Sequence, residues 1–256
     1  MAERTSYAPG TFSWAELVTS DAGAAKAFYT EAFGWSYDDN PVPDGPVYSM
    51  ALRDGKQVAA LFASDEQPPH WNCYVTVASA DETAAKAKEA GATVMAEPFD
   101  VMDVGRMAVI ADPTGAVLAV WEPRRHIGAR IVNEPGALCW NELATNDVAA
   151  AKKFYEGLFG WSTEDMGDGA YTMVRVGDRT NGGIRPMGEM ESGMPPNWLA
   201  YFAVPDSDES AAKAGELGGN AIVPPMDVPV GESSRIAVIA DPQRAVFGIF
   251  SGPLDS

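Results

Sequence analysis

Two glutamates, each two residues after a tryptophan, are the residues of this sequence best suited to acid–base chemistry. The pairs are Trp14 with Glu16 and Trp140 with Glu142. Residues two apart on a strand face the same side, so each carboxyl would share a face with an aromatic ring. Inside an apolar cavity such a carboxyl would hold its proton near neutral pH and suit general acid–base catalysis. The alternative is a structural role, in which each glutamate pairs with an arginine or with backbone donors.

Aromatic residues crowd the strands predicted around these glutamates. They are Trp14, Tyr48, Trp71, Tyr74 and Trp121 in the first half of the chain, and Trp140, Tyr171, Trp198, Tyr201 and Phe250 in the second. Rigid rings with polar tips suit an aromatic or polycyclic ligand. An ordinary sheet core is the competing interpretation.

Polar side chains near these rings could orient a substrate. Strand parity places Asn72 on the same face as Tyr74, and His70 on that face as well. Arg106 opens a later strand, and an arginine at a cavity mouth can bind a carboxylate or an enolate oxygen. Solvated charge at a strand end is the alternative for Arg106. The stretch 185–198, rich in Gly, Pro and Met, is a candidate mobile loop over a pocket, or simply a linker.

Few other kinds of site are compatible with the composition. The only histidines are His70 and His126, the latter expected in a linker, and the only cysteines are Cys73 and Cys139. These numbers predict neither a disulfide framework nor a zinc site with several histidines. No GxGxxG, GxSxG or CxxC motif is present.

The elements that must position these residues occur twice. Residues 14–36 and 140–162 match at 14 of 23 positions, and RMAVIADP at 106–113 matches RIAVIADP at 235–242 at 7 of 8. The repeat predicts two homologous domains, residues 1–126 and 133–256, joined through the polar, Pro- and Gly-containing stretch 122–136.

Each half contains two copies of one βαβββ module. In the first module a strand near 11–19 precedes a helix that Asp21 caps and Gly34 ends. A second helix is expected from an Asp81 cap to Gly91, followed by strands near 93–97, 106–111 and 116–121. The fold class is therefore α+β, with a curled mixed sheet in each half.

The charge of the chain restricts its partners. Lys plus Arg is 18 and Asp plus Glu is 36, which gives a net charge of −18. Such a protein repels phosphate backbones and anionic lipid surfaces, so neither nucleic acid nor membrane is expected as a partner. No apolar run reaches the roughly 20 residues that span a bilayer, and no signal peptide is evident. A cytoplasmic location is predicted.

The repeated FY…FGW helix and the late DPTGAVLAVWEP strand resemble the vicinal oxygen chelate superfamily, which includes glyoxalase I, bleomycin-resistance proteins and extradiol dioxygenases. The resemblance covers nearly the whole chain, and the tandem form is most similar to actinobacterial two-domain glyoxalase-like proteins. It implies paired modules that form an open sheet around a cavity. In metal-using members, His and Glu side chains on the cavity face hold one divalent ion.

The positions that match the family's metal ligands do not carry metal-binding side chains here. They fall on or near Trp14, Asn72 and Ala119 in the first half, and Trp140, Leu199 and Gly248 in the second. The resemblance therefore implies a protein without a catalytic metal or other cofactor, in which Trp14 and Trp140 face the cavity and bring Glu16 and Glu142 with them.

Three functions remain open at this point. The first is a metal-independent tailoring enzyme, a cyclase, isomerase or dehydratase of antibiotic biosynthesis, that acts on an aromatic or polyketide-like molecule with Glu16 or Glu142 as acid–base. The second is a bleomycin-resistance-like protein that binds a small molecule without chemistry. The third is a metal-dependent lyase of the glyoxalase I type. The duplication allows a pseudo-two-fold monomer, and a homodimer is equally compatible.

Overall fold

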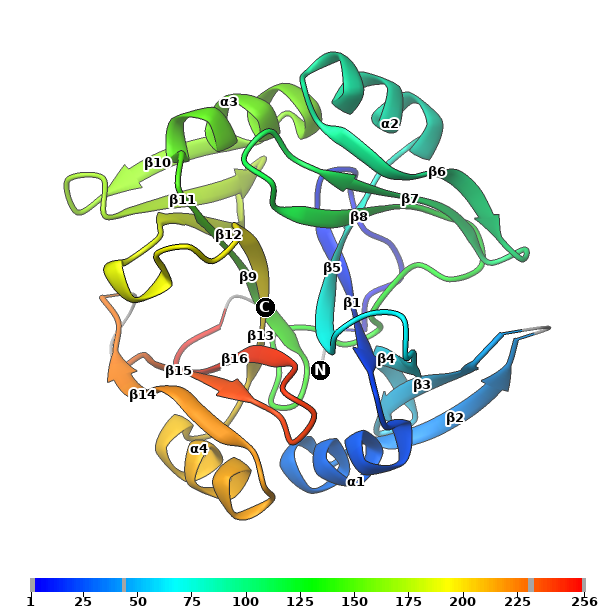
Figure 1. Cartoon of the computed structure of the whole chain (residues 1–256), viewed down its shortest axis with the longest axis vertical. Helices are drawn as coiled ribbons and strands as arrows, with labels where there is room; N and C mark the ends of the chain where they lie inside the picture. The colour runs from blue at the N-terminus through cyan, green and yellow to red at the C-terminus, as the bar shows by residue number, and fades with distance from the viewer. Residues whose placement is uncertain (1–2, 43–44, 230–232, 255–256) are drawn as a thin grey trace.

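Two curled eight-stranded sheets make up the protein (Figure 1). The computed structural model describes residues 3–42, 45–229 and 233–254. The N-terminal sheet contains β1 Phe12–Thr19, β2 Ser36–Pro41, β3 Val47–Arg53, β4 Lys56–Ala63, β5 His70–Thr76, β6 Thr93–Val101, β7 Gly105–Ala111 and β8 Val117–Pro123. The C-terminal sheet contains β9 Leu138–Thr145, β10 Ser162–Met166, β11 Tyr171–Val176, β12 Arg179–Pro186, β13 Asn197–Ala203, β14 Asn220–Asp227, β15 Arg235–Ala240 and β16 Val246–Ser251.

The strand order confirms two βαβββ modules in each sheet. The orders are β2-β3-β4-β1-β5-β8-β7-β6 and β10-β11-β12-β9-β13-β16-β15-β14. The first strands of the two modules, β1 with β5 and β9 with β13, pair antiparallel at the centre of each sheet. The predicted α+β class and tandem arrangement are therefore confirmed.

Local sequence signals begin and end the first helix of each half. In α1, Ala22–Phe33, the Asp21 carboxylate accepts the Ala24 amide at 2.9 Å, and Gly34 ends the helix at φ +73°. The first helix of the second half is α3, Val148–Phe159. The second helix of each half is α2, Ala80–Glu89, or α4, Ser207–Glu216. The prediction of an Asp81 cap was wrong, because the Ser79 hydroxyl accepts the Glu82 amide and Asp81 lies in the first turn.

The register of the central strands places both glutamates at equivalent positions. On one side Glu16 lies opposite Ala60 of β4, and on the other it lies opposite Asn72 of β5. Glu142 lies in the same way between Gly183 of β12 and Leu199 of β13. Because side chains alternate along a strand, Ala15 and Leu17 point to the opposite face.

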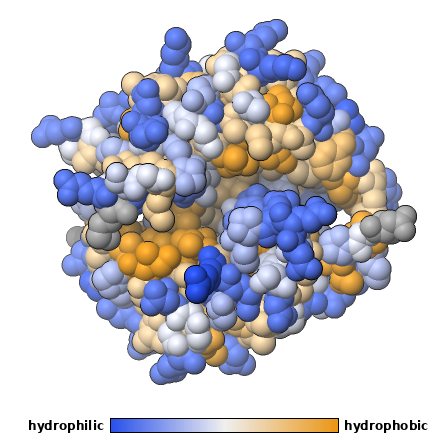
Figure 2. Space-filling view, in the orientation of Figure 1, coloured by the Kyte–Doolittle hydropathy of each residue, from blue (hydrophilic) through white to orange (hydrophobic). Residues whose placement is uncertain are grey.

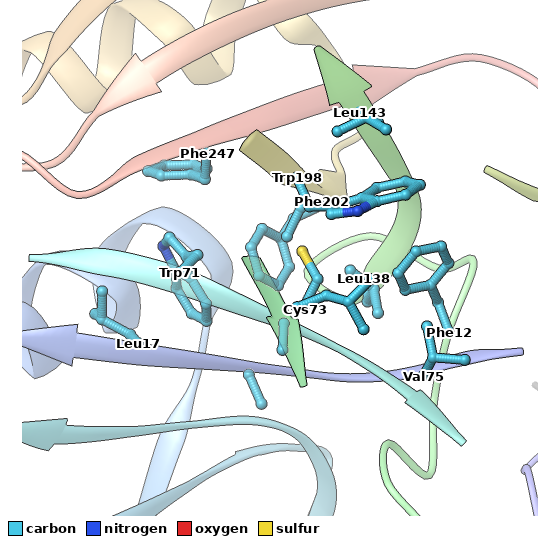
Figure 3. Close-up of a cluster of buried hydrophobic side chains, with 14 of the residues drawn as sticks. Phe12, Leu17, Trp71, Cys73, Val75, Leu138, Leu143, Trp198, Phe202 and Phe247 are labelled. Atoms are coloured by element: carbon cyan, nitrogen blue, oxygen red, sulfur yellow. The ribbon is translucent and has the colours of Figure 1, made fainter. Parts of the chain in front are cut away.

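The two sheets pack back to back through that opposite face. One continuous core joins them, and Figure 3 shows Leu17, Trp71 and Cys73 together with Trp198 and Phe202. In Figure 1, α2 and α3 lie side by side at one end of this core, and α1 and α4 lie at the other. The sheets curl away from each other, so each presents a concave face that is turned away from its partner sheet.

Trp71 and Trp198 belong to this inter-sheet core rather than to a ligand-binding wall. The Trp71 indole donates to the Tyr29 hydroxyl at 3.1 Å, and the Trp198 indole donates to the Tyr155 hydroxyl at 2.8 Å. Strand parity explains the correction, because Trp71 pairs with Leu17 in the register and therefore shares its face.

Two symmetry-related hydrogen bonds cross between the halves and explain the repeated ADP sequence. Tyr29 of α1 donates to Asp241 at 2.9 Å, and Tyr155 of α3 donates to Asp112 at the same distance. Each aspartate lies in the turn before the last strand of its sheet, and both are almost completely buried. The repeated FY and ADP motifs therefore join the two halves of the chain to each other.

The helices are short. The longest have 12 residues. Among the residues that the structure describes, none of the helices has the length and apolar character needed to cross a bilayer.

Candidate functional site

Glu16 lies on the concave face of the N-terminal sheet, where two tyrosines hold its carboxyl group. Tyr48 donates to one carboxyl oxygen at 2.8 Å and Tyr74 donates to the other at 2.8 Å. The Asn72 amide adds a longer contact of 3.5 Å. Only 8% of Glu16 is exposed, and burial raises the pKa of its carboxyl, an effect that the hydrogen bonds from Tyr48, Tyr74 and Asn72 oppose.

His70 extends this arrangement to the edge of the face. Its Nε2 lies 3.1 Å from the Asn72 side-chain oxygen, and its Nδ1 lies 2.8 Å from the Pro68 carbonyl. Asn72 therefore bridges His70 and Glu16. The four side chains predicted to orient a substrate near Glu16, namely Tyr48, His70, Asn72 and Tyr74, are brought together by the fold.

Aromatic rings form the floor beside Glu16. Trp14 is 2% exposed and its indole lies 3.4 Å from the Tyr48 hydroxyl. Trp121 packs in the same cluster with Ala60, Tyr74 and Ala119. These positions place Trp14 and Trp121 where the sequence predicted them.

His126 is a residue of the floor that sequence reasoning missed. The segment after β8 folds back, so that the His126 ring meets Trp14 at 4.6 Å and Trp121 at 5.7 Å between centroids. Burial lowers its pKa to about 4, and within the described structure neither ring nitrogen has a hydrogen-bond partner. The imidazole is therefore neutral at pH 7. Nothing in the sequence around His126 distinguishes it from an ordinary linker residue.

The rest of the concave face is apolar and partly open. Met50, Met107 and Val109 pack beside Trp14 and Trp121 and are only partly buried, while Phe99 at the outer strand is 45% exposed. Figure 2 shows hydrophobic surface, in orange, at the concave side of the C-terminal sheet as well, over β15 and β16. Half-buried apolar side chains around a few polar groups suit a hydrophobic small molecule.

Glu142, the counterpart of Glu16, has a different environment. Arg185 donates to its carboxylate from Nε at 2.9 Å, and Tyr201 donates to the same oxygen at 3.2 Å. The Trp140 indole donates to Tyr171 at 2.9 Å, and the Glu142 charge helps to raise the pKa of Tyr171, which burial raises first. Glu142 is thus an ion-paired carboxylate.

Two positions distinguish the surroundings of the two glutamates. Asn72 lies opposite Glu16 where Leu199 lies opposite Glu142, and the second position provides the ion pair. Arg185 of β12 lies opposite Ala144 of β9. At the same register in the N-terminal sheet, Phe62 of β4 lies opposite Val18 of β1. Phe62 stacks on Tyr48 at 6.4 Å between centroids. The predicted alternative, in which a glutamate pairs with an arginine, therefore holds for Glu142, whereas tyrosine hydroxyls hold Glu16. An alignment of the β4 and β12 sequences would have revealed the Phe62–Arg185 difference.

Arg106 lies on the helix side of the sheet rather than at the mouth of the concave face. Its guanidinium binds both oxygens of Asp81 at 2.6 and 2.9 Å and Asp100 at 3.0 Å. Its neighbour Met107 faces the concave side, so alternation along β7 places Arg106 on the opposite face. Arg235 forms the equivalent ion pairs with Asp208 and Asp227.

The residues of the concave faces do not fit the divalent metal ion that metal-using members of the resembled superfamily hold. The register places Ala60, Asn72 and Ala119 around Glu16, and both Glu16 oxygens already accept tyrosine hydroxyls. Among the described residues there is no group of three His, Cys, Asp or Glu side chains that could hold a metal.

Replacing Glu16 with Gln is expected to change how stability depends on pH. The pKa of the Glu16 carboxyl is higher in the folded protein than in the unfolded chain. Its protonated form therefore contributes its full stability below the pKa of the unfolded chain, and this contribution is lost as the pH rises through the pKa of the folded protein. Glu16→Gln lacks this loss and becomes increasingly stable relative to wild type as pH increases. Urea unfolding between pH 4 and pH 8 measures the difference, with the exposed Glu189→Gln as control; a difference that is constant with pH would contradict the assignment.

Comparison with known proteins supports a common architecture for both halves. Residues 11–120 match the model of the glyoxalase/bleomycin resistance protein/dioxygenase superfamily, and residues 138–177 match that of the bleomycin resistance protein-like N-terminal family. The Mn(II)-bound glyoxalase from Novosphingobium aromaticivorans is 17% identical with a TM-score of 0.67, covering 95% of this chain and 82% of that one. The 2,3-dioxygenase LapB from Pseudomonas sp. KL28 is 15% identical with a TM-score of 0.64, covering 94% and 92%.

Relatives of higher identity match over nearly their whole lengths. The "Putative glyoxylase CFP32" of Mycobacterium tuberculosis is 45% identical, covering 97% of this chain and 97% of the relative. The anthracycline biosynthesis protein DnrV of Streptomyces peucetius is 34% identical, covering 96% of this chain and 94% of the relative.

Proposed function

Because this chain belongs to the glyoxalase/bleomycin resistance protein/dioxygenase superfamily, we propose that it is a tailoring enzyme that uses the Glu16 carboxyl as acid–base on an aromatic, polyketide-like molecule. The similarity to an anthracycline biosynthesis protein supports the substrate class. The reaction class is a proton transfer that leads to cyclisation, isomerisation or dehydration.

The observation that carries the proposal is the environment of Glu16. Its carboxyl is buried beside Trp14, bound by two tyrosine hydroxyls, and raised in pKa, whereas the equivalent Glu142 is neutralised by Arg185. Burial that raises the pKa of a carboxyl makes it a better proton donor at neutral pH than an exposed, fully ionised glutamate. Only the N-terminal sheet offers this combination in the part of the chain that the structure describes.

The surrounding residues have separate tasks in this proposal. Glu16 gives its proton to a substrate oxygen and later takes one back from carbon, or performs the two steps in reverse. Tyr48 and Tyr74 donate to the carboxylate that forms, which stabilises it without a full counter-charge. Trp14 and Trp121 are buried beneath this face and fix the strands that carry Glu16 and Tyr74, and Asn72 is near enough to bind a polar substrate atom.

Incubation with a panel of anthracyclinones and simpler anthraquinones tests this function. We expect one member to be converted to an isomer or a dehydrated product, detected by mass spectrometry and NMR, after the protein has been treated with a chelator. In deuterated water the new C–H bond would carry deuterium. Recovery of every panel member unchanged, including those that bind, would contradict an enzyme of this class.

The second candidate is a binding protein that performs no chemistry. The observation that favours it is the match of residues 138–177 to a bleomycin resistance protein-like model, together with a net charge of −18 that attracts cationic drugs. Tight, stoichiometric binding of a cationic drug without any product, measured by calorimetry, would support this function.

A further inference from the structure

A second polar centre, separate from Glu16, lies at the end of β12 on the concave face of the C-terminal sheet. Arg185 binds Glu142 through Nε and binds both oxygens of Glu191 through its two terminal nitrogens, each at 2.7 Å. Two carboxylates thus share one guanidinium. The Glu191 pair has the parallel geometry with which arginine recognises free carboxylates.

Glu191 comes from a loop that is longer in this half of the chain. Ten residues, 187–196, connect β12 to β13, whereas six residues, 64–69, connect β4 to β5. The added length forms the short helix Glu189–Glu191, and it is this turn that carries Glu191 to Arg185. The N-terminal sheet has Phe62 where Arg185 stands, so the longer loop and the arginine occur together.

The loop is held at few points and borders an open cleft. Glu191 binds Arg185 and accepts the Gly188 amide at 2.8 Å, and the Met187 amide donates to Thr145. A cleft of about 670 Å³ lies between the loop and the end of β9, lined by Thr145, Asn146 and Glu191 among others. The loop therefore has space on one side into which it can swing.

A tyrosine hydroxyl lies close to the guanidinium on the side of the sheet, because Tyr201 donates to the same Glu142 oxygen that Arg185 Nε binds. The Arg185 charge acts on both Tyr171 and Tyr201, opposing the burial that raises their pKa. Trp140 donates to Tyr171 and is only partly buried. An arginine that binds a carboxylate through two nitrogens, with tyrosine side chains close by, is matched to a carboxylate on an aromatic ring.

We propose that Arg185 is the anchor of a binding site for an aromatic carboxylate, and that Glu191 occupies this site in the free protein as an internal substitute for the ligand. Binding exchanges the Glu191 carboxylate for that of the ligand, so the charge around Arg185 is unchanged and Glu142 keeps its partner. Loop 187–196 moves out as the ligand enters. The overall charge of −18 repels anions, so affinity has to come from this local contact.

Glu191→Gln tests the exchange directly, because it weakens the internal competitor and leaves Arg185 and Glu142 in place. The probe is 4-hydroxybenzoate, titrated by calorimetry into the full chain, with its neutral methyl ester as reference. When only a fraction of the protein is open, the apparent Kd equals the Kd of the open state divided by that fraction, so the ligand binds more weakly. We expect Glu191→Gln to bind the acid about ten-fold more tightly than wild type, on the order of the penalty imposed by a mostly closed loop.

The controls separate this site from general electrostatics and from the proposed function. Glu189→Gln removes the same charge from the same turn without touching Arg185, and should leave the affinity unchanged. Adding Arg185→Lys to Glu191→Gln should abolish the gain, since lysine lacks the two-nitrogen contact. Equal affinity in wild type and Glu191→Gln, an equal gain for the ester, or a gain that survives Arg185→Lys would each overturn the proposal. Glu16→Gln should bind the acid as wild type does, so either proposal can fail alone.

Discussion

Glu16→Gln is expected to lower turnover of a panel substrate at least ~100-fold while the protein stays folded, because positioned acid–base groups contribute about 10²–10⁴-fold. Glutamine keeps the size of the side chain. Its amide oxygen can accept from one of Tyr48 and Tyr74, and its NH₂ group can donate to the hydroxyl oxygen of the other. It cannot exchange a proton at the working pH. Turnover and KM are measured together; the loss should appear in turnover, since the shape of the concave face is retained.

Glu142→Gln is the matched control. It alters the same position of the other sheet, where Arg185 already neutralises the carboxylate, and should change turnover less than about three-fold, which is on the order of an ordinary contact loss. A direct observation accompanies the kinetics. In a carbon NMR titration, a glutamate carboxyl signal with a raised pKa should be present in wild type and Glu142→Gln and absent in Glu16→Gln, while the signal of Asp241, whose pKa burial also raises, should remain in all three. Equal activity of the two variants, or persistence of the glutamate signal, would refute the role of Glu16.

Asp112→Ala should destabilise the whole chain by about 3–5 kcal/mol, because several buried donors lose their acceptor at once. One carboxylate oxygen of Asp112 accepts the Thr114 amide, the Thr114 hydroxyl and the Ala116 amide at 2.7 to 3.0 Å. The other accepts Tyr155 from the opposite half at 2.9 Å. For a chain of this size the loss corresponds to a fall of about 10 °C in Tm.

The same experiment examines whether the halves unfold together. Because the core is continuous between the sheets, we expect one cooperative thermal transition in wild type and in Asp112→Ala, followed by calorimetry. Asp103→Ala, an exposed partner of Arg125, should shift stability by less than about 0.5 kcal/mol. Two separate transitions, only one of them shifted, would show that the halves are independent and that the Tyr155–Asp112 contact contributes little.

Much of the architecture was predictable because its signals are local. The repeat at residues 14–36 and 140–162 predicts two copies of one unit, and caps such as Asp21 and Gly34 act within a single turn of helix. Alternation along a strand is equally local, so Trp14 and Glu16 were assigned to one face without knowledge of the partner strands. The same rule, applied to Arg106 and Trp71, would have placed them on the helix side and in the inter-sheet core.

By itself the sequence determined that the chain has two similar sheets and that a glutamate lies at the centre of each. Only the tertiary structure decided that these carboxyls differ. Arg185 reaches Glu142, whereas Phe62 packs on Tyr48 instead, and both positions are set by strand pairings between residues more than 40 positions apart. It likewise decided that His126 folds back onto Trp14 and that Tyr155 meets Asp112. The physical reason is that the protonation of a buried group depends on its desolvation and on neighbouring charges, and both are set by segments distant in the chain.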